Sequence, residues 1–525
     1  MEFVPGLIDV IMSFPSSIFY ATCSIILTTY FLLNAWNARR KEAQAARLHG
    51  CKPTPKVRSL DPVIGVDNFF EILKADFAGH RSEAYRNLHN EYGPTFLFKM
   101  LGVTSVQTAQ PQNIQAICTS AFQDFGVGPL RGTIGLPFFG RGIFTEDGEF
   151  WKYSRSLVRP TFSRAEIADL DNFENHVKRF LAHIPRDGST FDMLPLAKRL
   201  FLDTATDFMF GESTECLSSS APLETDIFLK AFDRSLLGLA LLLTFGPLRW
   251  PLYLDPYWRT AYTKVHTFLD KHVHRAIERQ QLPREVNSHK YVLLEEMAKI
   301  TQDPYQLRMQ ILNVFFPARD TAAIAFADLM FELVRHPHEW QKLKDEVQNM
   351  DSNQKLTYEF LRSLKMVKAV INETLRLHPA ASRITKIALR DVVLPKGGSD
   401  DGQSPFLVHK GTVVEMDLYT VQRDPSIWGE DADEFKPDRW LDPGRPLWEA
   451  KWQYEPFLGG IRMCPAQNQV LIQLSYILVR LAQEVEVLEN RDEVWDYIER
   501  VSLTVESKNG VKMAVKRDES TVDDL

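Results

Sequence analysis

The chain has 525 residues, of which 45% are hydrophobic and 25% are charged, which is ordinary for a globular protein and sufficient for a core that encloses a cofactor. The formal net charge of −7 gives no basic footprint, so nucleic-acid binding is not expected. The five cysteines are widely spaced and include no Cys-x-x-Cys pair, which indicates a reducing compartment and excludes a disulfide framework.

The N-terminus carries a long uncharged stretch, with no charged residue between Asp9 and Arg39. About 20 apolar residues cross a bilayer as a helix, so we predict a transmembrane anchor at 16–36 behind a lumenal segment 1–15. The basic run 39–41 follows at once, and the positive-inside rule then places the rest of the chain in the cytosol. A cleaved signal peptide is the alternative, but it would carry its positive charge before the apolar run.

Three further regions are expected beyond the anchor. A basic, proline-stiffened linker occupies 37–63, a single catalytic domain fills 64–516, and 517–525 is a polar tail. The domain contains no internal repeat, and its sequence lacks the Gly-x-Gly-x-x-Gly fingerprint of a dinucleotide-binding domain. Electrons or hydride must therefore come from a separate protein.

Within the domain, a long helix is predicted over 303–336. Asp303 is a good N-cap and Pro304 suits the first helical position. The helix contains Phe-Pro-Ala-Arg-Asp-Thr-Ala at 316–322. Because Pro317 has no N–H to donate to the preceding turn, the helix is expected to kink or open there.

A second helix is predicted to end before Pro379, and it carries Glu-Thr-Leu-Arg at 373–376. A spacing of three places Glu373 and Arg376 on one face, which suits a charge-assisted pair. At the surface such a pair would stabilise by only about 0.2–0.5 kcal/mol. The segment Phe-Lys-Pro-Asp-Arg-Trp at 435–440 follows further along the chain.

Strands are expected in two places. The stretch 384–414 is rich in strand-forming residues, and alternating apolar residues at 501–505 and 511–515 flank Asn509-Gly510. This dipeptide accepts the positive φ angles of a type I′ turn, so we predict a terminal β-hairpin. The expected fold is mainly α-helical with small β-sheets (α+β).

The decapeptide Phe-Leu-Gly-Gly-Ile-Arg-Met-Cys-Pro-Ala at 457–466 is the most informative segment. Cys464 stands between a glycine turn and a predicted helix start, where backbone N–H groups stabilise a thiolate. With no Cys or His partner nearby in the sequence, zinc is disfavoured and axial ligation of heme iron is favoured. A buried free cysteine is the alternative.

This decapeptide resembles the heme-binding loop of the cytochrome P-450 family, Phe-x-x-Gly-x-Arg-x-Cys-x-Gly. Phe457, Gly460, Arg462 and Cys464 match that pattern, whereas Ala466 replaces its last glycine. The oxygen-helix motif, the Glu-x-x-Arg pair, the Pro-x-Arg segment and the cysteine loop also occur in the order typical of the family. The resemblance spans about 61–516 and is closest to fungal microsomal members, which include alkane and fatty-acid hydroxylases.

The resemblance implies that Cys464 is the axial thiolate of heme b and that Asp320 and Thr321 deliver the protons needed to cleave O2 in an apolar pocket. Lys386 stands where the family often carries a propionate-binding arginine, with Arg383 nearby. The remaining implied residues are the heme contacts Trp151, Arg155, Phe457 and Arg462, and a buried structural network of Glu373, Arg376 and Arg439.

The function so implied is that of a monooxygenase in the endoplasmic reticulum membrane, single-pass, with its catalytic domain in the cytosol. It would take electrons from a separate NADPH-cytochrome P-450 reductase, with cytochrome b5 as a further partner. It would hydroxylate or epoxidise a lipophilic small molecule, in fungal secondary-metabolite biosynthesis or alternatively as a fatty-acid or alkane hydroxylase.

Two other classes stay open at this point. One is a heme-thiolate isomerase or dehydratase that does not use O2, against which Asp320 and Thr321 count. The other is a non-catalytic heme-binding protein. Pro317, Ala318 and Ala466 depart from the family pattern and favour that class, whereas the intact Cys464, Glu373 and Arg376 count against it.

Overall fold

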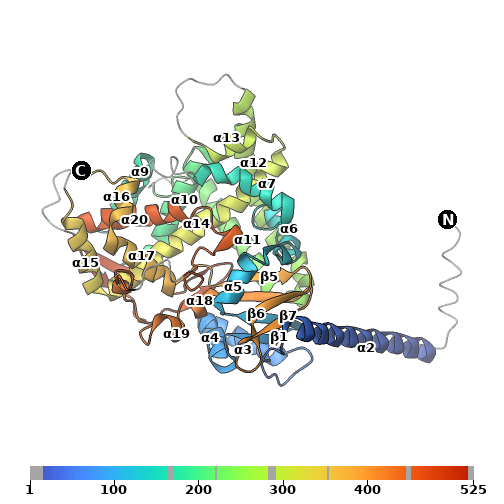
Figure 1. Ribbon diagram of the computed structural model, residues 1–525. Helices are drawn as coiled ribbons and strands as arrows, with labels where there is room; N and C mark the ends of the chain where they lie inside the picture. The colour runs from blue at the N-terminus through green and yellow to red at the C-terminus, as the bar shows by residue number, and fades with distance from the viewer. Residues whose placement is uncertain are drawn as a thin grey trace.

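The computed structural model describes residues 16–162, 170–218, 222–281, 291–351, 354–444 and 451–517 (Figure 1). Helices make up most of it and the β-sheets are small, so the predicted fold class is confirmed. The α-helices are α2 (Ser16–His49), α3 (Val66–Ala78), α4 (Arg81–Tyr92), α5 (Pro111–Cys118), α6 (Thr133–Phe139), α7 (Gly148–Val158), α9 (Asp171–Ala182), α10 (Met193–Phe210), α11 (Leu223–Thr244), α12 (Pro256–Gln281), α13 (Leu293–Ala298), α14 (Pro304–Arg335), α15 (Pro337–Gln348), α16 (Tyr358–Ser363), α17 (Lys365–Leu377), α18 (Leu418–Val421), α19 (Pro425–Trp428) and α20 (Gln467–Glu484). The strands are β1 (Thr95–Met100), β2 (Val103–Thr108), β3 (Phe125–Gly126), β4 (Phe191–Asp192), β5 (Arg383–Ala388), β6 (Val392–Gly398), β7 (Ser404–Val408), β8 (Val413–Asp417), β9 (Val485–Asn490), β10 (Glu499–Val501), β11 (Val505–Ser507) and β12 (Lys512–Arg517).

Helix α14 runs through the centre of the molecule, and nearly all of its side chains are buried (Figure 1). It begins as predicted: the Asp303 carboxylate accepts from the N–H of Tyr305 at 3.0 Å. The helix is continuous to Arg335 with Pro317 inside it, so it does not open at the proline. The side-chain amide of Asn313, one turn earlier, donates to the carbonyl of Phe139 at 2.9 Å and fastens α14 to the end of α6.

Two hydrophobic cores lie on either side of α14. One joins its C-terminal half to α10, α17 and α20, and the other joins its N-terminal half to α6, α11, α12 and α13. Phe326 belongs to the first core and Phe315 to the second, and both side chains are fully buried. α14 is thus held from all sides, which fixes the position of the 316–322 segment between the cores.

The strand-rich patch predicted at 384–414 is confirmed as β5 to β8. Strands β5 and β8 pair antiparallel within a sheet of order β1-β2-β8-β5-β3, and β6 and β7 form a separate antiparallel ribbon. Successive residues of a strand point to opposite faces, so Arg383 and Lys386 face opposite sides of β5. Arg383 lies near Glu415 and Asp417, at 3.5 and 3.6 Å, on the face away from the cysteine loop.

The predicted terminal hairpin is wrong in its pairing. Strand β10 pairs with β11 across the short turn 502–504, whereas β12 pairs with β9 and β4. Gly510 has a φ of 73°, but Asn509 is not among the described residues with positive φ, so the pair does not form a type I′ turn. Pairing with the longer β9 buries Met513 and Val515 in the main core, and this burial outweighs the local turn preference.

Helix α2 leaves the body as a single long rod (Figure 1). It continues to His49, so the first part of the expected linker is helical. Its C-terminal end packs on the β6–β7 ribbon: Lys41 pairs with Asp391 at 2.7 Å, and the N–H of Lys52 donates to the carbonyl of Pro405 at 2.9 Å. No helix among the described residues combines the length and the apolar character that crossing a bilayer requires.

Candidate active site

The cysteine loop is closed by backbone contacts. The N–H of Cys464 donates to the carbonyl of Phe457 at 2.9 Å, which brings the two ends of the motif together. Gly460 has a φ of 74°, and a Cβ there would lie 2.2 Å from the carbonyl oxygen of Cys118 at the end of α5. The glycine of the motif is therefore needed both for its conformation and for the close approach of α5.

The sulfur of Cys464 lies just before α20, at the helix N-terminus. Burial raises the pKa of the thiol, while hydrogen bonds from the backbone N–H groups of Ala466 and Gln467 and the charge of Arg155 lower it. Pro465 has no N–H to contribute. These donors point to the sulfur from the start of α20, an arrangement that favours a thiolate once a cation binds opposite it.

Four cations surround the loop, and they come from distant parts of the chain. Arg155 of α7 donates to the carbonyl of Met463 at 3.0 Å. Burial is the main cause that lowers the pKa of Arg462 to about 10, and the charges of Arg131 and Arg155 lower it further. Arg131, in the one-turn helix Gly128–Gly132, was not predicted from the sequence.

Lys386 is the most unusual of these cations. Its side chain is only 2% exposed, and its Nζ has no hydrogen-bond partner among the described residues. Burial lowers the pKa of Lys386 to about 8, and the nearby charges of Arg462 and Arg131 act in the same direction. A buried ammonium group without a partner costs several kcal/mol, so the arrangement calls for an anion at this place. The two carboxylates of a heme fit that need.

Trp151 lies between two of the arginines. Its side chain is 5% exposed, and the guanidinium groups of Arg462 and Arg155 lie 4.7 and 5.7 Å from the centre of its ring. Phe457, at the start of the loop, packs against the main core. The structure thus gathers Trp151, Arg155, Lys386, Phe457, Arg462 and Cys464, the residues expected to hold heme b, around one place.

Asp147 is a second residue that sequence reasoning missed. It directly precedes α7 and would be read as an ordinary N-cap, yet its side chain makes no capping bond to that helix. Its carboxylate instead accepts from Arg462 at 2.6 Å and from the N–H of Gly128 at 2.7 Å. The two donors to this carboxylate lie 19 and 315 residues from Asp147 in the sequence, so no local signal reveals them.

Asp320 and Thr321 lie side by side on α14 but interact differently. The hydroxyl of Thr321 donates to the carbonyl of Pro317 at 2.7 Å. Asp320 is buried, its Oδ1 has no hydrogen-bond partner among the described residues, and it lies 3.4 Å from Nε of Arg319. Burial raises the pKa of Asp320, with Arg319 opposing it, so the carboxyl can hold a proton nearer neutral pH than an exposed aspartate.

Behind the cysteine loop, Glu373 is the centre of a buried network. Both of its oxygens accept from Arg376 at 2.8 Å, and Oε1 also accepts from Arg439 at 2.8 Å. The indole N–H of Trp440, which was not singled out from the sequence, donates to Oε2 at 2.9 Å. Glu373 and Arg376 are fully buried, so this pair is not the weak surface pair that its spacing alone allows.

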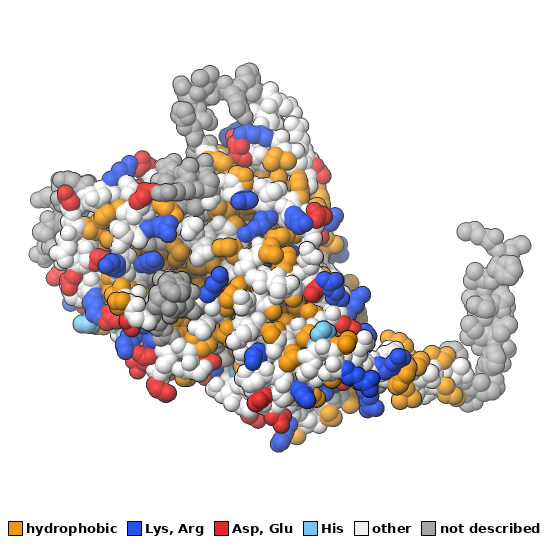
Figure 2. Space-filling model, viewed as in Figure 1, with side chains coloured by type: hydrophobic (Ala, Val, Ile, Leu, Met, Phe, Trp, Pro, Cys, Tyr) orange, Lys and Arg blue, Asp and Glu red, His pale blue; other side chains and the backbone are white. Residues whose placement is uncertain are grey.

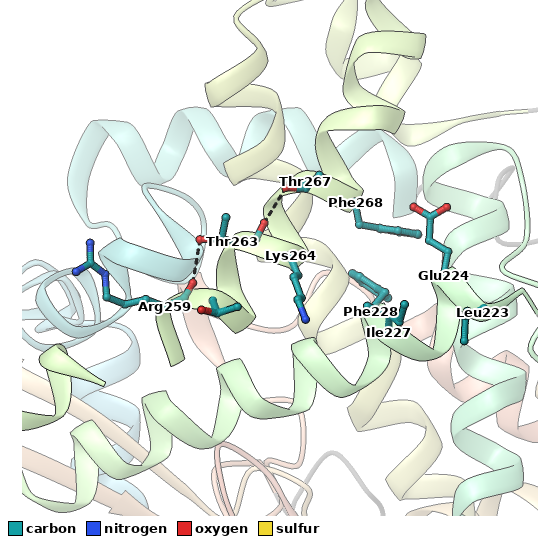
Figure 3. Close-up of a pocket in the computed structure, with 10 residues that line it drawn as sticks. Leu223, Glu224, Ile227, Phe228, Arg259, Thr263, Lys264, Thr267 and Phe268 are labelled. Carbon is teal, nitrogen blue, oxygen red and sulfur yellow. Dashed lines mark hydrogen bonds between the residues drawn. The ribbon is translucent and has the colours of Figure 1, made fainter. Parts of the chain in front are cut away.

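A hollow of about 680 Å³ lies outside the predicted heme site, between α11 and α12 (Figure 3). Leu223, Ile227 and Phe228 line it from α11, and the side chains of α12 that face it include Thr263 and Lys264. None of the residues predicted for the heme site lies among those that line it, and no group of metal-ligating side chains occurs in the described part of the chain. Its size therefore does not make it the catalytic centre.

A half-buried cysteine at a helix N-terminus, with nearby cations that include a buried lysine without a hydrogen-bond partner among the described residues, fits the class of heme-thiolate proteins. The sequence model of the cytochrome P-450 family matches residues 62–513. The chain is similar to cytochrome P-450 monooxygenase fsdH of Fusarium heterosporum, with 34% identity over 96% of this chain and 90% of that protein. The match to cytochrome P-450 monooxygenase fumoA of Cordyceps fumosorosea is 35%, over 97% and 99% of the two chains.

Cytochrome P-450 52A3-B of Candida maltosa is also similar, at 34% identity over 93% of this chain and 95% of that protein. The crystal structure of the heme domain of a cytochrome P-450DA mutant shares the fold, with a TM-score of 0.74 over 89% of this chain and 98% of that chain, at 20% identity. The chain belongs to the cytochrome P-450 family. It is a cytochrome P-450 monooxygenase with fungal relatives, and the family implies heme held by a cysteine thiolate.

Proposed function

We propose that this monooxygenase hydroxylates or epoxidises a lipophilic small molecule, with electrons from NADPH through a separate reductase. The observation that carries the proposal is that the same chain holds the cysteine loop and Asp320, a buried carboxyl group on the helix whose two halves belong to the two cores. Bound heme would supply O2 activation, a chemistry that amino-acid side chains do not provide. An isomerase that does not use O2 has no need of such a buried acid.

The residues of this chain have distinct tasks in the proposal. Phe316 forms an aromatic group with Phe139 and Phe144, with ring centres 5.4 and 5.7 Å away, at the start of the 316–322 segment. These rings exclude water and suit an apolar substrate. Asp320 lies within that segment, where burial raises its pKa and suits it to deliver protons, and Thr321 keeps its hydroxyl on the Pro317 carbonyl until a water or substrate offers a better partner.

The test combines the purified protein with a cytochrome P-450 reductase, NADPH and a panel of lipophilic compounds that includes fatty acids, alkanes and polycyclic metabolites. With ¹⁸O2 the product should gain one labelled oxygen atom, and no product should form without NADPH. Product that forms without NADPH and carries no label would support an isomerase or dehydratase instead. Cytochrome b5 can be added to the same assay, where an increase in turnover would support it as a partner.

Replacing Asp320 with asparagine should slow product formation by about 10²-fold while the carbon-monoxide spectrum stays unchanged, because positioned acids contribute at least that factor. NADPH consumption should continue, with hydrogen peroxide replacing product. Asp328→Asn is the matched control: Asp328 is buried on the same helix, burial raises its pKa, and its Oδ1 accepts from Tyr497 at 2.9 Å. Equal losses in both variants would contradict a specific role for Asp320.

Attachment to the endoplasmic reticulum membrane, with the catalytic domain in the cytosol, is part of the proposal. Helix α2 exposes apolar side chains such as Ile25, Leu32 and Trp36, each more than half exposed. Lysine and arginine follow where the helix nears the body, and Figure 2 shows orange and blue side chains in that order. Apolar residues followed by a basic run favour a membrane anchor with the body on the cytosolic side.

Deletion of residues 1–36 should therefore release the protein from membranes. The full chain should stay in the membrane fraction after alkaline carbonate extraction, and the shortened chain should appear in the supernatant with its carbon-monoxide spectrum intact. Removing 518–525 is the control and should leave the distribution unchanged. A full chain that is extracted by carbonate would contradict the anchor without affecting the proposed chemistry.

A further inference from the structure

Asp147 connects three parts of the chain that surround the heme site. It stands at the N-cap of α7, whose Arg155 is one of the four cations and whose Trp151 ring lies beside Arg155 and Arg462. Its carboxylate accepts from the N–H of Val127 at 2.9 Å and from the N–H of Gly128 at 2.7 Å, and from Nη2 of Arg462 at 2.6 Å. One side chain thus joins the segment after β3, the start of α7 and the cysteine loop.

By bonding to these distant groups, Asp147 forgoes the favourable hydrogen bond that an N-cap residue makes to its own helix. An N-cap aspartate ordinarily accepts a bond from its own helix and stabilises it by about 1 kcal/mol. Here the φ and ψ angles of −121° and 176° suit a cap, yet the side chain makes no such bond. The carboxylate therefore gives up a nearby partner for the Arg462 guanidinium and the backbone of 127–128.

The backbone opposite Asp147 is shaped for this contact. A Cβ at Gly126 would lie 2.4 Å from Oδ2 of Asp147, and a Cβ at Gly128 would lie 3.0 Å from the same atom. Neither glycine has a positive φ, so conformational freedom does not explain them. What explains them is the close approach of the carboxylate, which a larger side chain at either position would block.

The charge of Asp147 acts on three of the four cations. It raises the pKa values of Arg131, Lys386 and Arg462, in each case against the lowering effect of burial. Without this carboxylate the three cations would repel one another more strongly and would protonate less readily. Asp147 thus partly compensates a group of like charges gathered at one place.

We propose that Asp147 is a positioning residue for heme: it holds Arg462 directly, and Arg131 through the 127–128 backbone, where these two arginines together with Lys386 receive the two heme carboxylates. This inference rests on heme binding at Cys464, as the family implies. It adds a residue outside the predicted motifs, one that contacts neither the iron ligand nor the proton-delivering pair. Asp147 stabilises the bound heme through its neighbours.

The test is the rate at which heme leaves the ferric holoprotein for an excess of apomyoglobin. Asp147→Asn keeps an oxygen that can accept from the backbone but removes the charge, and it should release heme roughly tenfold faster, as expected for the loss of a charge-assisted contact. Asp147→Glu keeps the charge, and its rate of heme release should lie between those of the wild type and Asp147→Asn. Glu149→Gln is the matched control, because Glu149 lies two residues away with a side chain 88% exposed, and it should behave as the wild type.

A second measurement separates positioning from general stability. If Asp147 acts through Arg462, its replacement should have little additional effect in an Arg462→Gln background, whereas independent effects would multiply. Unchanged heme release in both Asp147 variants, or full multiplication in the double variant, would overturn the proposal. If Asp147→Asn does not fold, the rate of heme release from Asp147→Glu decides the question. A wild-type protein that takes up no heme would instead refute heme binding itself.

Discussion

Replacing Cys464 with alanine should abolish the strongly red-shifted Soret band of the reduced, carbon-monoxide-bound protein. The band depends on a thiolate that donates electron density to iron, and alanine has no donor atom to replace it. The measurement is the difference spectrum of the purified protein, with bound heme quantified separately. Monooxygenase turnover should fall below detection in the same variant.

Cys216→Ala is the matched control for that experiment. Cys216 is a free cysteine like Cys464 but is more fully buried, and burial raises the pKa of its thiol to about 11. It lies in the core formed by α11, α12 and α14, away from the cysteine loop. Its replacement should leave the red-shifted band in place. A band that survives in Cys464→Ala but disappears in the control would show that the ligand has been misassigned.

Replacing Glu373 with glutamine should prevent the accumulation of folded, heme-containing protein. Glu373 is fully buried and accepts from Arg376, Arg439, the indole of Trp440 and the N–H of Lys436. Removing its charge leaves the buried guanidinium of Arg376 without its ion-pair partner and leaves Arg439 with only Asp431, at 3.3 Å. Breaking a buried pair in this way costs about 3–5 kcal/mol. That is a large part of the stability of a typical domain. Expression level, heme content and thermal unfolding of whatever is recovered give the measurement.

The contrast for this prediction is a pair of the same spacing at the surface. Glu149 and Lys152 are also three residues apart on a helix and lie 2.7 Å from each other, with side chains 88% and 62% exposed. Removing the charge of Glu149 should hardly change the unfolding midpoint, since solvent screens such pairs. If both variants unfold at the wild-type temperature, the buried network contributes nothing and the prediction is refuted.

Features encoded locally were predictable from the sequence. Asp303 and Pro304 start α14 where the capping pattern places them, and the strands of the 384–414 patch form. Helical spacing correctly put Glu373 and Arg376 on one face, and the structure joins them to Arg439 sixty-six residues from Glu373. The burial that makes this network strong was not contained in the spacing and came only through the family resemblance.

Features that depend on tertiary packing were not predictable in the same way. The Asn509-Gly510 turn signal was overridden because β12 gains a longer partner and a buried face by pairing with β9. Arg131 and Asp147 lie in segments whose local sequence indicates a loop and a helix cap. Both act on Arg462, which is more than three hundred residues away from Asp147 in the sequence. Patterns in a single sequence do not reveal contacts between residues so far apart.

The seat of α2 on the β6–β7 ribbon has a mechanical consequence. A helix of 34 residues is a rod of roughly 50 Å, because each residue adds 1.5 Å. Its inner end is clamped by the pair of Lys41 with Asp391 and by the buried methyl group of Ala45. Because α2 is long and is held at its inner end, a tilt of its outer end would pull on β7, against which that inner end packs. The surroundings of residues 16–36 thereby set the orientation of the whole catalytic body.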